Sequence, residues 1–221
     1  MGDLLRETRA IRDEIAVKYL VPDLLVPDLK LVFCGTAPSK ASAAAKAYYA
    51  KPGNKFWPTL HTVGITPARF APHEYPALLA LGIGLTDLCK AFSGIDSTLP
   101  KDAFNTVAFA RKLKKYRPKI VAFTSKNAAQ NYFGRSVDYG WCNRDHAQAP
   151  TSVRFCVLPS PSGLATRYFD IEIWRSWPNT VRLTVRGEAV EPRRPFDKLM
   201  ANGQTVQIRL TEQYWELTHG I

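Results

Sequence analysis

Two short loops of small residues and prolines could bring backbone amides close to a ligand. The first loop is Gly35–Ser39, which follows the apolar run Leu31–Cys34, and the second is Pro159–Gly163, which follows Phe155–Leu158. Taken alone, the first loop would be an ordinary strand-to-helix turn. The matching second loop favours a shared site instead, because loops at the carboxyl ends of parallel strands meet at one edge of a sheet, where ligands bind.

The elements that must position these loops alternate along the chain. Strands are expected at 30–34, 119–124 and 153–158, and a short element at 82–88 should reach the same sheet edge. Helical patterns occupy 3–20, 54–63, 72–81, 101–116 and 125–133, while 39–50 could be a helix or a mobile loop and 141–152 reads as a loop. This order predicts a three-layer α/β/α sandwich with a central, mainly parallel sheet of about four strands.

Two of the helical segments carry more detailed expectations. Helix 101–116 should turn Phe104, Val107, Ala108 and Leu113 inward, and its basic end, 111–117, reads as a solvated face that could also contact phosphates. Ser125 is a plausible N-cap for helix 125–133.

The pattern changes after residue 180. Residues 181–185 and 205–210 alternate like antiparallel strands, and turn-forming residues lie between them. We therefore divide the chain into an N-terminal helix and connection (1–27), a main domain (28–180) and a β-hairpin-like C-terminal extension packed on that domain (181–221).

Composition narrows the class of partner. The 221 residues are 46% hydrophobic and carry a formal net charge of +11, which points to a polyanion such as nucleic acid, although a generally basic protein would look the same. No apolar run is long enough for a membrane span, and no signal peptide is evident. The four cysteines have no metal-ligand spacing. We expect a monomer without metal or cofactor in the reducing cytoplasm.

Three motifs, taken together and in order, are specific. They are FCG-x-x-P at Phe33–Pro38, P-small-N-basic-FW at Pro52–Trp57, and LP-x-PSGL at Leu158–Leu164. With gaps from about Leu31 to Tyr168, the chain resembles the uracil-DNA glycosylase superfamily, most closely its mismatch-specific uracil- and thymine-DNA branch. The resemblance implies an enzyme that flips uracil, and possible further damaged bases, out of DNA and hydrolyses the N-glycosidic bond in base-excision repair.

The resemblance also implies roles for individual residues. Gly35, Thr36, Ala37 and Pro38 match the water-activating motif, next to Ser39, and the backbone of Thr36 would line the base pocket. Tyr49 matches an aromatic residue on which the flipped base stacks, and Asn54 matches a residue that shapes the pocket. Phe56 and Trp57 are expected in the core. The DNA-binding loop would be Ser160, Pro161, Ser162, Gly163, Leu164, Ala165, Thr166 and Arg167, with Leu164 as the wedge in the vacated stack and Ser162, Thr166 and Arg167 near phosphates.

Two departures from the family pattern bear on mechanism. Ala37 stands where the closest relatives have a water-holding Asn, and Ser160 stands where the superfamily often has His or Asn. Asp87 is our candidate for reading the N3–H of uracil or positioning water, although it could equally be a helix cap or an ion pair. The hydroxyls of Thr36 and Ser39 are other candidates for holding the water.

The departures leave a second function open. Without the Asn at Ala37, the chain could be a catalytically weak module that binds DNA or abasic sites. A serine hydrolase using Ser160 or Ser162 is poorly supported, because there is no Gly-x-Ser-x-Gly elbow. Lys40 and Lys46 are weak candidates for a Schiff base, so we expect hydrolysis without strand cleavage.

Overall fold

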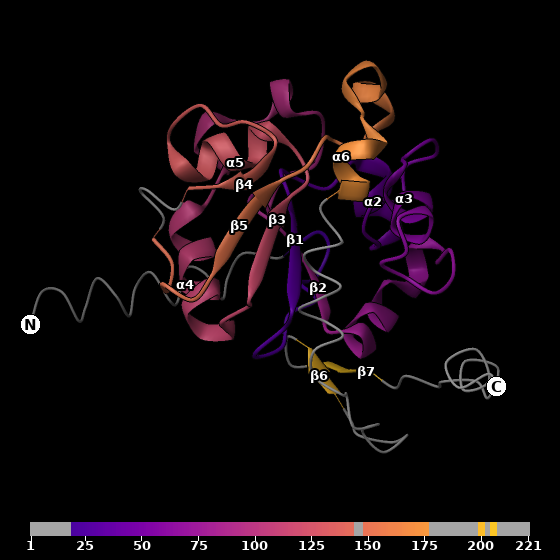
Figure 1. The fold of residues 1–221 in the computed structure, drawn as a ribbon, viewed down its shortest axis with the longest axis horizontal. Coiled ribbons are helices and arrows are strands. Elements are labelled where there is room, and N and C mark those ends of the chain that lie inside the picture. The colour runs from indigo at the N-terminus through magenta and orange to yellow at the C-terminus, as the bar shows by residue number, and fades with distance from the viewer. Residues whose placement is uncertain (1–18, 144–147, 177–198, 202–203, 207–221) are drawn as a thin grey trace, which may run out of the picture.

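A five-stranded sheet runs through the centre of the protein, with strand order β2-β1-β3-β5-β4 (Figure 1). The structure is a computed structural model that describes residues 19–143, 148–176, 199–201 and 204–206. The strands are β1 (Leu31–Gly35), β2 (Ile83–Asp87), β3 (Ile120–Phe123), β4 (Gly140–Cys142) and β5 (Arg154–Val157). All neighbours pair in parallel except β4 and β5. The mainly parallel sheet is thus confirmed, with five strands instead of about four.

The additional strand is β4, which begins just before the segment that we expected to be a loop. It spans three residues and pairs antiparallel with β5, so that Gly140 lies opposite Val157 and Cys142 opposite Phe155. None of its residues is fully buried, and Trp141 is exposed. An edge strand of this kind needs no continuous apolar run, and therefore its sequence carries little strand signal.

Helices cover both faces of the sheet, which confirms the three layers (Figure 1). One face packs against α4 (Thr106–Tyr116) and α5 (Lys126–Phe133). The other face packs against α3 (Phe56–Thr62), the 3₁₀ helix η1 (Pro72–Leu81) and α6 (Ile171–Ser176), with α2 (Lys40–Ala45) beside them. Three short 3₁₀ turns, η2 (Asp96–Thr98), η3 (Lys101–Ala103) and η4 (Gly163–Tyr168), complete the described helical elements.

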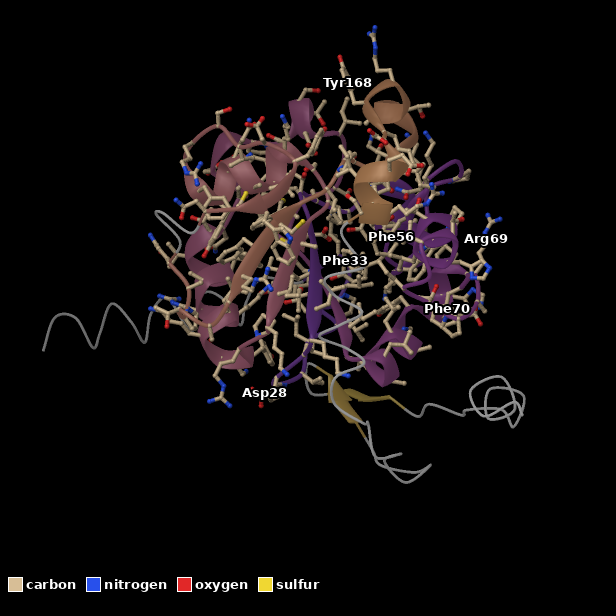
Figure 2. The ribbon with its side chains drawn as sticks, viewed as in Figure 1. Asp28, Phe33, Phe56, Arg69, Phe70 and Tyr168 are labelled. Carbon is tan, nitrogen blue, oxygen red and sulfur yellow. The ribbon has the colours of Figure 1, made fainter. Side chains whose placement is uncertain are left out.

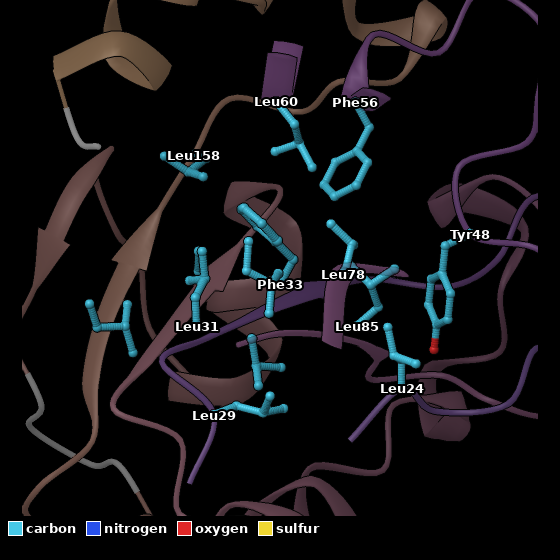
Figure 3. Close-up of a cluster of buried hydrophobic side chains, with 14 of the residues drawn as sticks. Leu24, Leu29, Leu31, Phe33, Tyr48, Phe56, Leu60, Leu78, Leu85 and Leu158 are labelled. Atoms are coloured by element: carbon cyan, nitrogen blue, oxygen red, sulfur yellow. The ribbon is translucent and has the colours of Figure 1, made fainter. Parts of the chain in front are cut away.

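The core on the α3 side is built from aromatic and leucine side chains. Phe33 of β1 meets the ring of Phe56 edge-on, with centroids 5.2 Å apart, and stacks on Trp174 at 6.0 Å. Figure 3 shows Phe33 pointing from its strand toward Phe56 and Leu60. Phe56 and Trp57 are buried, as predicted. A second cluster, which includes Phe109 and Phe123, fills the opposite face.

Helix α4 begins later than the pattern predicted. Residues 101–103 form the separate turn η3, and Asn105 caps α4 by accepting a hydrogen bond from the backbone N–H of Ala108 at 2.8 Å. Starting at this cap, the helix turns Val107 outward to 51% exposure and buries Phe109 in its place. The inward position expected for Val107 is therefore wrong, whereas Ala108 and Leu113 are buried as predicted.

The remaining expectations have mixed outcomes. Only Lys40–Ala45 of segment 39–50 is helical. The N-cap at Ser125 is confirmed, since its hydroxyl accepts from the N–H of Ala128 at 3.0 Å. Residues 3–18 of the expected helix 3–20 and the expected strand 181–185 lie outside the described residues, whereas Tyr19 and Leu20 are described and are not helical. Near the C-terminus, β6 (Leu199–Ala201) and β7 (Gln204–Val206) pair antiparallel. No helix in the described part of the chain is long and apolar enough to cross a membrane.

Candidate active site

The loops that follow β1, β2, β3 and β5 surround one pocket at the carboxyl edge of the sheet. Its volume is about 420 Å³. In Figure 2, Tyr168 lies at the end of the molecule where this pocket is, and Asp28 lies at the opposite end. Both predicted loops contribute, and the lining comprises Gly35, Thr36, Ala37, Pro38, Ser39, Ser42, Tyr48, Tyr49, Lys51, Asn54, Asp87, Gly94, Ile95, Asp96, Ser97, Thr124, Ser125, Ser160, Pro161, Ser162, Leu164, Ala165 and Tyr168.

Gly35 and Asp87 meet at the floor of this pocket. They are register partners at the ends of β1 and β2. A Cβ atom placed on Gly35 would lie 2.3 Å from Oδ1 of Asp87 and 3.5 Å from the hydroxyl of Tyr49. The Asp87 carboxylate therefore occupies the space that any other residue at position 35 would fill. Glycine is required here for a close approach, and no positive φ is involved.

The Asp87 carboxyl group is buried without a full set of partners. It is 4% exposed, and its Oδ2 has no hydrogen-bond partner among the described residues. Burial raises the pKa of Asp87 to about 6, and the negative charges of Asp23 and Asp96 act in the same direction, while Lys90 and Lys112 oppose them. The group is thus mainly ionised at neutral pH. A buried acceptor that lacks a donor is costly, so this oxygen is suited to a donor supplied by a ligand.

Behind Asp87 lies a buried ionic cluster that the sequence did not reveal. Asp23 accepts from Lys90 at 2.8 Å, from Lys112 at 2.6 Å and from the hydroxyl of Thr86 at 2.7 Å. Burial alone would raise the pKa of Asp23, but the two ammonium groups outweigh it and hold that pKa below its usual value. Two cations and one anion leave one positive charge, which the ionised Asp87 balances. Lys112 therefore faces this cluster instead of solvent, contrary to the solvated face that we expected for segment 111–117.

The hydroxyls of Thr36 and Ser39, in the first loop, already make hydrogen bonds within the protein. Ser39 caps α2, because its Oγ accepts from the N–H of Ser42 at 3.1 Å and donates to the hydroxyl of Ser42 at 3.0 Å. The hydroxyl of Thr36 donates to Oδ2 of Asp96 at 3.2 Å and lies 3.1 Å from the hydroxyl of Ser125. Ala37 carries no polar side-chain atom. Thr36 and Ser39 both line the pocket, and the network of Thr36 also includes the carboxylate of Asp96.

Tyr49 and Asn54 line the pocket, but each also has a structural task. Tyr49 has a φ of +54°, its ring stacks on Phe56 with centroids 3.8 Å apart, and its hydroxyl lies 3.1 Å from that of Thr124. A positive φ in a tyrosine costs of order 1–3 kcal/mol and is retained where its surroundings enforce it. Asn54 uses its Oδ1 to accept from the N–H of Phe56 at 2.9 Å, at the start of α3.

The second loop is tied to the segment that precedes α3. The N–H of Lys55 donates to the carbonyl of Pro161 at 2.8 Å. A Cβ on Gly163 would lie 3.2 Å from the carbonyl oxygen of Gly53, so the two segments touch. Within the loop, Ser160 accepts weakly from the N–H of Ser162 at 3.4 Å. Two segments more than a hundred residues apart therefore form one wall of the pocket.

The tip of this loop projects into solvent. Leu164 and Tyr168 are each 65% exposed, although both also line the pocket. Ser162 caps η4 by accepting from the N–H of Leu164 at 3.3 Å, and Thr166 donates to the carbonyl of Gly163 at 2.9 Å. Gly163, Thr166 and Arg167 do not line the pocket, and the guanidinium of Arg167 lies 5.5 Å from the ring centroid of Tyr168.

Several lining residues were missed by sequence reasoning. The most notable are Asp96 and its neighbours in the loop after β2, together with Lys51 and Tyr168. Asp96 lies outside the resembling motifs, and only its position soon after a strand end could have indicated it. Within the described residues, no cluster of three His, Cys, Asp or Glu side chains could hold a metal ion. The four cysteines are free thiols.

Comparison with known proteins agrees with this geometry. A family model described as the Uracil DNA glycosylase superfamily matches residues 22–178. A solution NMR structure from Methanosarcina acetivorans, provisionally titled a uracil DNA glycosylase, is 23% identical with a TM-score of 0.51. That match covers 75% of this chain and 96% of the other, and it concerns the fold.

Proposed function

Because the chain belongs to the uracil DNA glycosylase superfamily, we propose that it is a monofunctional DNA glycosylase that excises uracil from DNA. The enzyme hydrolyses the N-glycosidic bond and leaves an abasic site, and other damaged bases could share the pocket. Its position nearest the mismatch-specific uracil and thymine branch is part of the proposal, and the motifs at Phe33–Pro38 and Leu158–Leu164 support it.

One observation carries the proposal most directly: a buried carboxylate on the floor of the pocket, one oxygen of which has no hydrogen-bond partner in the described part of the chain. A flipped uracil presents an N3–H donor on its Watson–Crick edge, and Asp87 supplies an acceptor. A site that hydrogen-bonds its substrate through a buried polar group discriminates strongly against bases that would leave this group without a partner.

The other walls of the pocket match the remaining requirements of base excision. Backbone N–H groups of the Thr36 loop stabilise the negative charge that develops on the departing base. Tyr49 stacks against the base, and Asn54 fixes the segment beside it. Leu164, exposed at the tip of its loop, fills the gap that the flipped nucleotide leaves in the duplex.

Three polar residues lie close to Leu164 in the sequence, one before it and two after it. Ser162, Thr166 and Arg167 are proposed to contact phosphates of the distorted strand, with the net charge of +11 favouring DNA binding in general.

A second candidate function has a specific observation in its favour. Ala37 offers no polar side chain, and the hydroxyl of Ser39 is already engaged in capping α2. A module that binds DNA or abasic sites without excising a base would tolerate this. Excision distinguishes the two functions, because only the enzyme creates alkali-labile sites.

The test is a panel of oligonucleotides, each carrying one modified base, treated with alkali after incubation to cleave abasic sites. The proposal expects cleavage at uracil after alkali and none before it. Asp87→Ala should lower excision strongly while DNA binding persists. Binding without cleavage at any base would establish the non-catalytic module, and wild-type excision by Asp87→Ala would remove Asp87 from the mechanism.

A further inference from the structure

The loop after β2 forms a wall of the pocket that none of the family motifs includes. Its Gly94 donates a backbone hydrogen bond to the carbonyl of Pro38 at 3.1 Å, which fixes this loop against the first one. Gly94, Ile95, Asp96 and Ser97 all line the pocket. A second carboxylate, that of Asp96, is thereby held beside the Thr36 loop.

Asp96 is oriented by a directed chain of hydrogen bonds. Ser125 accepts from the N–H of Ala128 at 3.0 Å, and its own hydroxyl can donate to that of Thr36 at 3.1 Å. Thr36 in turn donates to Oδ2 of Asp96 at 3.2 Å, and the side-chain amide of Asn127 donates to the same oxygen at 2.6 Å. Among the described residues, every hydrogen bond donated to this carboxylate ends on Oδ2. Its other oxygen, Oδ1, is left for a ligand.

The two carboxylates of the pocket differ in burial and in hydrogen bonding, which suits them to different tasks. Asp87 is buried on the floor, where it can meet the edge of a base. Asp96 is exposed, held in one orientation by two neutral donors, and it lies nearer the pocket's opening to solvent. DNA covering the pocket would exclude solvent from Asp96 and strengthen its electrostatic interactions.

We propose that Asp96 holds the attacking water through Oδ1 and takes its proton. This inference rests on the proposed glycosylase function. As the water oxygen forms its bond to C1′ of the sugar, the C1′–N bond breaks and its electron pair leaves with the base. One water proton passes to Asp96, and the departing base anion is later protonated by solvent. Asp96 thus performs the task for which Ala37 has no polar side chain, and Thr36 and Asn127 position it.

The experiment compares Asp96→Asn with the wild-type protein and with a matched control, Asp102→Asn. Asp102 is also exposed and lies six residues further on in η3, but it does not line the pocket. Single-turnover excision is measured on a uracil-containing oligonucleotide, and binding on one that carries 2′-fluoro-2′-deoxyuridine, whose glycosidic bond resists cleavage. A melting curve of each variant verifies folding.

We expect Asp96→Asn to bind the 2′-fluoro oligonucleotide as the wild type does but to excise uracil at least about 10²-fold more slowly. Asp102→Asn should match the wild type in both measurements. Asn127→Ala, which removes one donor to Asp96 without touching the carboxylate, should slow excision by about tenfold.

The outcomes separate this inference from the proposed function. If the wild type excises uracil and Asp96→Asn does so equally fast, Asp96 is not the base and the proposed function stands. A parallel loss of binding and excision in Asp96→Asn would also overturn the inference, because it would indicate a role in holding DNA. If the wild type excises no base at all, the proposed function fails and the inference fails with it.

Discussion

Replacing Gly35 with alanine should disable the site through a single contact. The new Cβ would lie 2.3 Å from Oδ1 of Asp87, whereas the next nearest atoms, Cγ of Asp87 and the hydroxyl of Tyr49, are both at 3.5 Å. An ordinary contact needs a separation of about 3.5 Å, so the carboxylate must move by roughly 1 Å. A displacement of that size at a reacting centre can cost about 10²-fold in rate. Overpacking should lower the free energy of unfolding by about 1–3 kcal/mol.

The structure also predicts how this penalty can be removed. In an Asp87→Ala background the offending oxygen is gone, so Gly35→Ala should cost no stability there. Relief from the entropy of a strand glycine could even add about 0.5–1 kcal/mol. The four proteins of this double-mutant cycle are compared by urea unfolding, and the single variants also by excision of uracil. An equal penalty of Gly35→Ala in both backgrounds would refute the close-approach explanation, because the clash would then involve another group.

Three further predictions concern charge and the exposed wedge. The pKa of Asp87 is raised from 3.8 to about 6 in the folded protein, so the contribution of this carboxyl group to stability falls as pH rises between these values. Asp87→Asn should therefore raise the free energy of unfolding at pH 7 by up to about 3 kcal/mol. Urea titrations at several pH values should also show a flatter pH dependence for this variant. Asp23→Asn leaves Lys90 and Lys112 buried without their anion and should cost about 3–5 kcal/mol by the same measurement; a loss below 1 kcal/mol would contradict the ionic cluster. Leu164→Ala should leave the melting temperature unchanged but slow excision from duplex more than from single-stranded DNA, and equal slowing on both would contradict its proposed role as a wedge.

The parts of the fold that were predictable are those in which burial dictates residue type. Strands β1, β3 and β5 are short apolar runs because both of their faces are covered by helices. Strand β4 lies at an edge with Trp141 exposed, and so the same signal is missing. The register of α4 depends on the cap at Asn105, which a count of apolar spacings from residue 101 could not include.

The candidate site was predictable to the extent that its loops follow predicted strands. Gly35, Asp87 and Ser160 line one pocket because parallel strands end at the same edge. Asp96 was not predictable, since it is positioned by hydrogen bonds donated by Thr36 and Asn127, which depend on how the loop after β1, the turn η2 and helix α5 are arranged in space. The pairing of Asp23 with Lys112 is likewise a contact between segments whose sequences give no indication of each other.

The hydrogen bond from Lys55 to Pro161 has a mechanical consequence. It joins the segment that begins α3 to the segment that carries Leu164. Under the proposed function, DNA that displaces Leu164 would therefore also shift the pocket wall beside Asn54. Insertion of the leucine and the shape of the base pocket would then be coupled through this one contact.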